Sequence, residues 1–574
     1  MNNLKVSIGQ YSDKGRKLEN QDFHGIHIPE DSLRGIKGIA VAMADGISSS
    51  AVSHIASQTA IQSFLQDYYC TSEAWSVKGS AERVLSATNS WLYSQTMSSP
   101  HRYDKDKGYV CTFSALIIKG HSAHILHIGD TRIYRFNSNG LEQLTNDHRL
   151  WATQDKSYLS RALGIESKCN YDYQLLSINA GDIFIITTDG VYEFVSAQDI
   201  VSTLEQHHDN LNSAAQAITT LAYEQGSDDN LSIQIVRIDN LPEQAVNHVK
   251  QQIEQLPFPP ELRGRMVFDG YTILREIHAN SRSHVYLAQD NASKKQVVLK
   301  TPSVDLGGNE DYLEHFLMEE WVARRINNTH VMKAELPDRP RNYIYTVFEF
   351  IKGKTLAQWA IDNPKADIEA VRSIVEQITK GLYAFHRMEM LHQDLRPENI
   401  MIDTDGVIKI IDFGAVSIAG LQETTIEQPA TYLQGTALYS APEYFLGEYG
   451  TTRSELFSLG VITYYLLSGR YPYDTNVAKT KTLSAQKKLW YRSVLEEDRE
   501  IPKWVDYAIQ KAVHPLPSQR YEEIFEFTHD LRQPSKQFLN KIRPPLIERN
   551  PVAVWQAISS ILLMIILYLL SLGQ

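Results

Sequence analysis

Cysteine is scarce in this chain, and basic residues are fewer than acidic ones. The 574 residues include three cysteines, Cys70, Cys111 and Cys169, which lie far apart. This number and spacing fit neither a disulfide framework nor a metal knuckle, and they indicate a reducing compartment. Lys plus Arg total 56 against 68 for Asp plus Glu, and no basic stripe runs through the body of the chain. Nucleic acid is therefore not an expected partner.

A signal peptide is also missing, because no apolar run follows the first charged residue. The opposite end differs, since residues 550–574 carry no charge and residues 552–572 are nearly all apolar. About 20 such residues cross a hydrocarbon core, and the basic segment before them, residues 534–550, favours the cytoplasmic side. We predict a single transmembrane helix over 551–573 in the cytoplasmic membrane, with the globular domains in the cytoplasm. A buried C-terminal helix is the alternative.

Two globular domains are expected between these ends, and 43% apolar residues are enough for sizeable cores. Residues 1–240 show a hairpin-rich α/β pattern, for example strand-like residues 124–128 and 133–136 around the turn Gly129-Asp130. Four prolines mark residues 241–265 as a linker. Residues 266–533 begin strand-rich and become helix-rich. The fold class is α+β.

Aspartates stand at the ends of buried strands in the first domain. Asp45-Gly46 follows the apolar run 39–44, Asp189-Gly190 follows 183–188, and Asp229 comes just before 231–236. Strand ends are rigid, and Mg²⁺ or Mn²⁺ prefers oxygen ligands of this kind. A single Asp-Gly after a strand is usually only a turn. Several in one domain predict a metal site.

Taken in order, the motifs of residues 5–238 resemble the protein phosphatase 2C family of metal-dependent Ser/Thr phosphatases. The matching motifs are Asn20-Gln21-Asp22, Ala44-Asp45-Gly46, Gly129-Asp130-Thr131-Arg132, the segments 144–148 and 159–164, Thr188-Asp189-Gly190 and Asp229-Asn230. The resemblance implies an α-β-β-α sandwich with two metal ions at one end. It implies that Asp45 bridges both ions, that the Gly46 carbonyl binds one, and that Asp189 and Asp229 hold the other.

The resemblance also assigns roles to residues around the two predicted metal ions. Asp22 would orient a water on the metals, and Asp130 would bind a third, weaker ion. Two cations about 3.5–4 Å apart lower the pKa of a water and stabilise charge on the phosphoryl oxygen. The substrate phosphate needs a basic partner: Lys17 has the family spacing, whereas Arg16 is the better bidentate donor, and both stay open. Gln21 departs from the metal-binding Glu of many relatives.

The second domain resembles the protein kinase signature set in order and spacing. The matching motifs are Lys300 at the end of residues 297–300, His392-Gln393-Asp394, Arg396 and Asn399, Asp412-Phe413-Gly414, Gly435-Thr436 and Ala441-Pro442-Glu443. The resemblance implies a bilobal fold. It implies that Asp394 accepts the proton of a substrate hydroxyl and that Asn399 and Asp412 bind Mg²⁺.

The remaining kinase roles follow the same resemblance. Lys300 would pair with the ATP phosphates and be held by Glu319, or by Glu320 as second choice, and Arg396 would touch the γ-phosphate. Residues 348–351 resemble the hinge segment that grips adenine. The resemblance implies that Phe348, Glu349, Ile351 and Val285 are cofactor-binding residues. Glu443 would pair with Arg520. Against the family pattern, residues 278–285 contain no glycine where three are expected, and Glu455 replaces the usual Asp.

The combination resembles the bacterial bifunctional Ser/Thr kinase/phosphatase proteins. It implies ATP with Mg²⁺ in one site, Mg²⁺ or Mn²⁺ in the other, and protein substrates carrying Ser/Thr or phospho-Ser/Thr. Thr431 and Thr436 are candidate autophosphorylation sites. Two alternatives stay open: a phosphatase governed by a nucleotide-sensing pseudokinase domain, which the loop without glycine motivates, and a membrane scaffold in which both sites are inactive.

Overall fold

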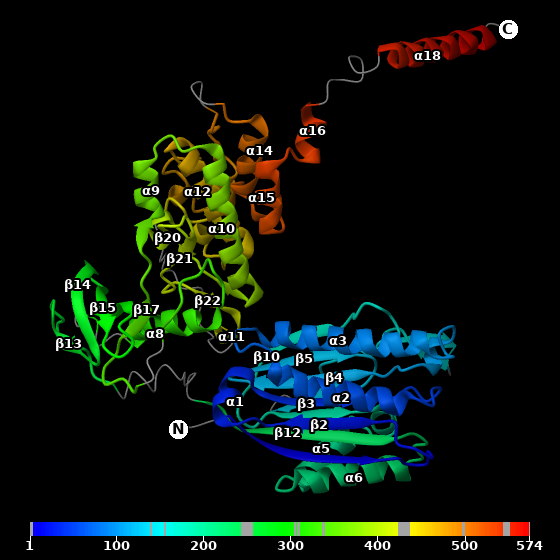
Figure 1. Ribbon diagram of the computed structural model, residues 1–574. Helices are drawn as coiled ribbons and strands as arrows, with labels where there is room; N and C mark the ends of the chain where they lie inside the picture. The colour runs from blue at the N-terminus through cyan, green and yellow to red at the C-terminus, as the bar shows by residue number, and fades with distance from the viewer. Residues whose placement is uncertain are drawn as a thin grey trace.

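The chain folds into two α+β bodies, which run from blue to green and from green to orange in Figure 1. The computed structural model describes residues 4–137, 140–153, 156–242, 256–279, 281–303, 306, 310–335, 339–422, 437–495, 500–542 and 551–572. Thr431, Thr436 and the Gly435-Thr436 motif lie outside the described residues.

The first domain is a sandwich of two antiparallel five-stranded sheets between helices (Figure 1). Its strands are β1 (Lys5–Asp13), β2 (Phe23–His27), β3 (Ile39–Ala44), β4 (Phe113–Lys119), β5 (Ser122–Ile128), β6 (Arg132–Asn137), β7 (Gly140–Gln143), β8 (Arg149–Thr153), β9 (Lys156–Leu159), β10 (Asp172–Ser177), β11 (Ile183–Thr187) and β12 (Leu231–Asn240). Its helices are α1 (Asp31–Lys37), α2 (Ser53–Cys70), α3 (Val77–Ser98), α4 (Asp189–Tyr192), α5 (Ala197–Gln206) and α6 (Leu211–Glu224). The sheet orders are β1-β12-β11-β6-β7 and β10-β5-β4-β3-β2.

Side-chain alternation along β3 explains how the layers pack. Ile39, Val41 and Met43 belong to the core between the two sheets, whereas Ala40 and Ala42 belong to the core under α2 and α3. Successive strand residues point to opposite faces, so one strand serves both cores. The small alanines let α2 lie close to the sheet, and all six residues of β3 are buried.

Residues 124–128 and 133–136 do not form the hairpin that we expected. They are β5 and β6, and they lie in different sheets. The chain crosses between the sheets at Gly129, whose φ of 109° lies in the region that favours glycine. The crossing places Asp130 at one end of the sandwich.

Antiparallel pairing brings the predicted aspartates to that same end. Thr187, at the end of β11, pairs with Ile233 near the start of β12, and Phe23, at the start of β2, pairs with Ala44 at the end of β3. Because neighbouring strands run in opposite directions, the end of one lies beside the beginning of the next. The strand-end carboxylates therefore come from both sheets and face one region.

The second domain has two lobes. The first lobe holds one antiparallel sheet, β13 (Val267–Phe268), β14 (Tyr271–Ala279), β15 (Ser283–Asp290), β16 (Gln296–Pro302) and β17 (Thr346–Glu349), with helix α8 (Glu310–Arg325). The second lobe holds short strands β18 (Gly353–Thr355), β19 (Met390–Leu391), β20 (Ile400–Asp403), β21 (Ile408–Ile410) and β22 (Ser417–Ile418). Its helices are α9 (Leu356–Asp362), α10 (Ile368–Arg387), α11 (Ala419–Gln422), α12 (Thr452–Ser468), α13 (Leu483–Gln486), α14 (Lys503–Ala512) and α15 (Ile524–Arg532).

Helix α12 is the centre of the second lobe. It is apolar on nearly all sides, as is typical of a helix enclosed by protein. A capping box between Thr451 and Ser454 begins it, and Gly469 ends it in the left-handed conformation. Leu456, Leu459 and neighbours pack into the same core as α10 and α14.

The C-terminal part of the chain contains α16 (Lys536–Ile542) and α18 (Pro551–Leu572). In the part of the chain that the structure describes, no helix has both the length and the hydrophobicity that a membrane crossing demands. Residues 551–572 of the predicted span 551–573 are helical, but the span finds no support as a membrane crossing.

Candidate active sites

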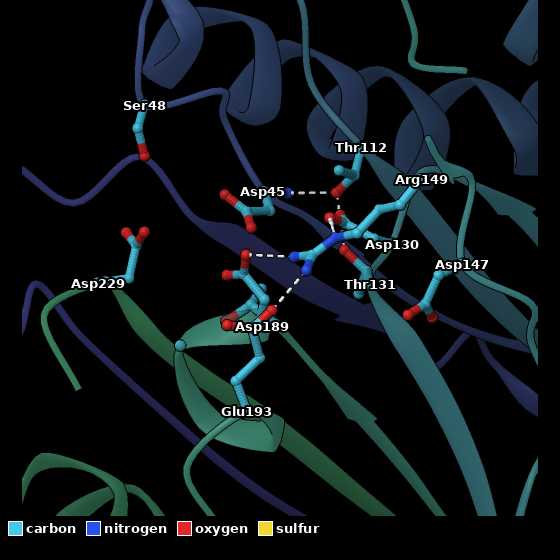
Figure 2. Close-up of polar contacts among 12 residues, drawn as sticks. Asp45, Ser48, Thr112, Asp130, Thr131, Asp147, Arg149, Asp189, Glu193 and Asp229 are labelled. Atoms are coloured by element: carbon cyan, nitrogen blue, oxygen red, sulfur yellow. Dashed lines mark hydrogen bonds and ion pairs between the residues drawn. The ribbon is translucent and has the colours of Figure 1, made fainter. Parts of the chain in front are cut away.

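Five aspartates from separate elements meet at one end of the first domain. Asp22 precedes β2, Asp45 follows β3, Asp130 follows β5, Asp189 begins α4 and Asp229 precedes β12. Figure 2 labels four of them, Asp45, Asp130, Asp189 and Asp229, around the same region. Hydrogen bonds fix the backbone and the carboxylates: the Asp45 amide donates to Thr112 Oγ1 at 2.8 Å, and Thr188 Oγ1 donates to Asp22 Oδ2 at 3.0 Å. The Asp22 Oδ1 atom is buried and has no partner among the described residues.

The negative charges of these five aspartates repel one another. Burial, followed by repulsion from Asp22, Asp189 and Asp130, raises the pKa of Asp45 well above its usual range. Burial is also the main cause that raises the pKa of Asp22 to about 6 and that of Asp189 to about 8. Desolvated carboxylates that repel one another are stabilised by a bound cation. The cluster has the electrostatics of a cation site.

An arginine supplies positive charge inside the cluster. Arg149, at the start of β8, donates to Asp130 Oδ2 at 2.5 Å, to Asp189 Oδ2 at 2.7 Å and to Glu193 Oε1 at 2.5 Å (Figure 2). Its side chain is 12% exposed. The sequence interpretation missed Arg149, although the residue directly follows the motif at 144–148.

Asp130, Asp189 and Glu193 are oriented toward this guanidinium. Among the described residues, no group of three or more His, Cys, Asp or Glu side chains is arranged to hold a metal ion. The predicted ligand set of Asp45, Asp189 and Asp229 therefore stays a prediction. Gly46 suits its place, because a Cβ there would meet Gln21 and Ser53 atoms at 2.9 Å.

The two candidate phosphate-binding residues have different surroundings. Lys17 Nζ lies 3.3 Å from Asp229 Oδ2 and donates to Ser48 Oγ at 3.2 Å, so it faces the cluster. Arg16 donates to the carbonyls of Ser227 and Tyr223 at 2.6 and 3.1 Å, and its guanidinium stacks on the Tyr223 ring. Arg16 therefore holds the loop, and the geometry favours Lys17 as the candidate that binds the substrate phosphate.

Gln21 has a structural task at the rim of the cluster. Its amide nitrogen donates to the Ser50 carbonyl and to Ser53 Oγ, both at 2.8 Å. A glutamate could not donate these bonds. The glutamine therefore holds the segment after Asp45, where the sequence reads Ile47 to Ser50.

In the second domain, a buried lysine joins two carboxylates. Lys300 Nζ lies 2.7 and 2.8 Å from the two oxygens of Glu319 and 3.6 Å from Asp412 Oδ1. The predicted pairing of Lys300 with Glu319 is thus present, and Glu320 instead binds Arg324 and Arg341. Burial raises the pKa of Glu319 to about 7, while attraction to Lys300 lowers the pKa of Asp412.

The loop after β19 carries the second part of this site. Asn399 Nδ2 donates to the Asp394 carbonyl at 2.9 Å and to Asp394 Oδ2 at 2.8 Å. Arg396 donates to Glu398 at 2.8 Å. Phe413 is 1% exposed and packs against Phe385, which places Asp412 toward Lys300.

The predicted adenine-binding residues lie between the lobes. Val285 pairs with Lys300 across β15 and β16, so both side chains project from one face of the sheet. Phe348 and Ile351 are buried. The Glu349 carboxylate binds Lys409 Nζ at 2.7 and 2.8 Å, which leaves any adenine contact there to the backbone.

The segment without glycine still forms a β-hairpin. β14 and β15 pair up to Ala279 and His284, with two register shifts in β14. The Arg282 carbonyl accepts from the Ser303 amide at 2.8 Å and from the Tyr312 hydroxyl. These bonds fasten the described part of the loop to the region around α8.

Comparison with known proteins finds a family match for each of the two domains. Residues 10–223 match the protein phosphatase 2C family, and residues 271–537 match the protein kinase domain family. This chain joins a phosphatase 2C domain to a protein kinase domain. Serine/threonine-protein kinase PrkC of Bacillus subtilis is 29% identical over 277 residues, 47% of this chain and 41% of that protein. PknA of Corynebacterium glutamicum is 32% identical over 203 residues, 34% of this chain and 43% of that protein.

The chain spans about two-fifths of the length of these curated relatives. Among solved structures, the phosphatase PstP of Mycobacterium tuberculosis is 22% identical, with 41% of this chain and 99% of that one covered and a TM-score of 0.35. The PknI kinase domain of the same species is 22% identical, with 48% and 98% covered and a TM-score of 0.36.

Glu455 stands where the kinase family usually has an aspartate, and its longer side chain still reaches the backbone before Asp394. Its Oε1 atom accepts from the backbone amides of His392 and Gln393, the latter at 3.2 Å, and its Oε2 atom lies 2.5 Å from His386 Nε2. Gln393 has a φ of 62°, a strained conformation for a residue other than glycine. The longer carboxylate thus holds the backbone just before Asp394.

Removal of Arg520 is expected to destabilise the kinase domain strongly. Arg520 binds both oxygens of Glu443 at 2.7 Å, as predicted, and the two side chains are 0% and 3% exposed. Breaking such a buried pair leaves an uncompensated charge, so Arg520→Ala should lower the free energy of unfolding by about 3–5 kcal/mol. Denaturant titration measures the loss. The control Arg532→Ala, whose side chain is 41% exposed, should cost less than about 1 kcal/mol.

The metal-free phosphatase domain should lose stability as pH rises from 6.5 to 8. The folded-state pKa of Asp189, about 8, exceeds its ordinary value of 3.8, so the folded state binds more protons and stability falls until pH passes 8. We expect a loss on the order of 1 kcal/mol relative to Asp189→Asn in chelator, seen as a drop in Tm of about 2–4 °C. Burial lowers the pKa of His124 to about 3, so the protonation of this histidine in the folded state does not change between pH 6.5 and 8. Equal pH profiles of both proteins would contradict the prediction.

Proposed function

We propose that this chain is a bifunctional regulator that phosphorylates protein Ser/Thr with ATP and hydrolyses protein phospho-Ser/Thr at a two-metal centre. The observation that carries the proposal is that each domain has its own set of converging charged side chains. The phosphatase domain gathers Asp22, Asp45, Asp189 and Asp229, and the kinase domain pairs Lys300 with Glu319. The overall activity, substrates and partners are part of the proposal.

The phosphatase residues have distinct tasks. Asp45, Gly46, Asp189 and Asp229 would hold Mg²⁺ or Mn²⁺, because hard cations take oxygen ligands. Bound there, two cations would supply an activated water and neutralise charge on the phosphoryl oxygens. Lys17, beside Asp229, would bind the substrate phosphate.

Three further groups support that centre. Thr188 donates to Asp22 and holds its carboxylate in a fixed orientation at the edge of the cluster. Asp130 is paired with Arg149 and would accept an additional cation only after that pair opens. Arg149 brings a planar guanidinium, which suits a carboxylate or a phosphate equally well.

The kinase residues are preorganised for phosphoryl transfer. Glu319 holds Lys300 where it can pair with the ATP phosphates, and Asn399 holds the Asp394 carboxylate for a substrate hydroxyl. Asn399 and Asp412 would bind Mg²⁺ with ATP, and Arg396 would reach the γ-phosphate. Val285, Phe348, Glu349 and Ile351 would enclose the adenine.

A second candidate function is a phosphatase governed by a nucleotide-sensing pseudokinase domain. The specific observation behind it is the hairpin of β14 and β15, which lacks glycine. Glycine lets backbone approach phosphate closely. Phosphate transfer, and not nucleotide binding alone, separates the two candidates.

One experiment tests the proposal on a single sample. The purified chain is given a phosphothreonine peptide with Mn²⁺ or with chelator, and separately an acceptor protein with γ-labelled ATP. We expect Mn²⁺-dependent phosphate release together with label transfer. Release without transfer would leave the pseudokinase candidate, and the absence of both would overturn the proposal.

Attachment to the cytoplasmic membrane through residues 551–573 stays a proposal from sequence hydropathy. It is tested by comparing the full chain with a chain ending at Ile542 in membrane flotation. Recovery of the full chain in the unbound fraction would rule it out.

A further inference from the structure

The phosphatase and kinase domains are joined by a buried contact that neither proposed site uses. Residues 73–76, just before α3 of the phosphatase domain, lie against three elements of the kinase domain. These elements are the end of α8, the end of α10 and helix α11, and Figure 1 shows α8 and α11 at the boundary with the phosphatase domain. Ala74 is 0% exposed and belongs to the same hydrophobic cluster as Val322 and Ile326 of α8 and its end.

Glu389 connects the end of α10 to the start of α3. Its carboxylate accepts from the Ser76 amide at 2.9 Å, from Ser76 Oγ at 2.8 Å and from Arg83 at 2.6 Å. Trp75 Nε1 donates to the Arg387 carbonyl at 2.9 Å. A carboxylate at a helix N-terminus is favoured by the exposed amides there. One domain thus caps a helix of the other.

Gly420 connects helix α11 of the kinase domain to the phosphatase domain. Its amide donates to the Ala74 carbonyl at 3.0 Å, and its carbonyl accepts from Lys119 Nζ at 2.5 Å. Lys119 is 0% exposed, so its ammonium is stabilised by a kinase carbonyl. A Cβ at Gly420 would meet three carbonyl oxygens of residues 73–75 at 2.7–3.0 Å.

Helix α8 makes the third connection. Arg325, in its last turn, binds Glu73 at 2.6 Å and lies over the Trp321 ring at 3.7 Å. Glu319 stands six residues earlier on the same helix, about 9 Å along the axis. A rigid helix transmits a shift of its last turn to the carboxylate that holds Lys300.

The same contact bears on the catalytic loop. Gly420 follows β22, and β22 pairs with β19, where Leu391 lies opposite Ser417. Asp394 comes three residues after Leu391. One loop of the phosphatase domain therefore contacts helix α8, which carries Glu319, and helix α11. Helix α11 follows β22, which pairs with the strand before Asp394.

We propose that the phosphatase domain is an intramolecular activator of the kinase domain, because this interdomain contact holds α8 and α11 where the Lys300–Glu319 pair is closed. The proposal rests on the proposed kinase activity. Its consequence is that loosening the contact lowers phosphate transfer and nucleotide affinity while phosphatase activity persists.

Glycine substitutions test the contact without touching either site. Gly420→Ala places a methyl group against backbone, and Gly79→Ala places one 2.1 Å from Glu389 Oε1 although alanine favours helix α3. We expect each to reduce phosphate transfer about tenfold, within the usual range of allosteric coupling. The matched control Gly35→Ala has no neighbour within 4 Å and should leave transfer unchanged.

A charge exchange supplies the rescue. Glu73→Arg and Arg325→Glu should each lower transfer, and the double variant should restore it, which a general folding defect would not do. Hydrogen exchange at residues 417–422 should rise in the single variants. Wild-type transfer in Gly420→Ala and in both charge variants would overturn the proposal.

A second readout separates this proposal from the kinase function itself. If the wild-type chain transfers no phosphate, the proposed kinase activity is wrong. The affinity for a fluorescent ATP analogue then tests whether the interdomain contact still controls the nucleotide site. Weaker binding by Gly420→Ala, with rescue in the charge exchange, supports the contact as an activator of the nucleotide site. Equal affinities in all variants contradict it.

Discussion

Asp45→Asn is expected to slow phosphate release from a phosphothreonine peptide by about 10²–10³-fold, the usual cost of removing a main electrostatic group of a site. Asparagine keeps the size of the side chain and removes its charge. Asp45 is the aspartate whose pKa is raised by burial and by four other aspartates, so it lies at the electrostatic centre of the cluster. A loss of charge there removes the group best placed to hold two cations.

The measurement is phosphate release with saturating Mn²⁺, accompanied by Mn²⁺ titration in a calorimeter. Mn²⁺ should bind more weakly to the variant. Asp209→Asn is the control, because that aspartate is fully exposed and its ion-pair partner is its neighbour His208. Near wild-type release by Asp45→Asn would contradict the two-metal proposal.

The same variant should gain label when incubated with γ-labelled ATP. Its kinase residues are untouched, and the opposing hydrolysis is absent, so phosphate added to the chain persists. A variant that neither releases phosphate nor gains label would point to a folding defect, which Tm checks.

Lys300→Ala is expected to reduce phosphate transfer by about 10²–10³-fold, because it removes a charge that stabilises the ATP phosphates. Asp394→Asn is expected to reduce transfer by about 10²–10⁴-fold, since positioned proton-transfer groups contribute on that scale. Burial lowers the pKa of Lys300, but attraction to Asp412 and Glu319 outweighs burial and raises it, so the ammonium stays charged. Its loss leaves Glu319, which is 4% exposed, without its partner.

The two variants report on different steps. Lys300→Ala should weaken ATP binding as well as transfer, whereas Asp394→Asn should bind ATP normally and fail in transfer. Lys295→Ala is the control, since that side chain is 57% exposed and pairs with Glu335 away from the site. ATP binding without transfer in the wild-type chain would favour the pseudokinase candidate.

Sequence patterns predicted the parts of both sites that lie on rigid strand ends. Asp45, Asp189 and Asp229 adjoin buried strands, and the antiparallel order of the sheets brings them to one end. The lysine and glutamate of the kinase domain were likewise predictable, because strand β16 and helix α8 have strong local patterns. The crossing at Gly129 was not, because a turn signal does not tell which sheet the next strand joins.

The sequence by itself identified the two domains, and it predicted which carboxylates and which lysine are the candidates for their chemistry. These residues lie in short sequence motifs, and the geometry of each motif depends on local backbone preferences. Only the tertiary structure decided that Lys17 and not Arg16 faces the aspartates, that Arg149 lies among them, and that Gly420 is held by the phosphatase domain. Each of these contacts joins loops far apart in the chain, and such contacts have no period or spacing that a sequence can display.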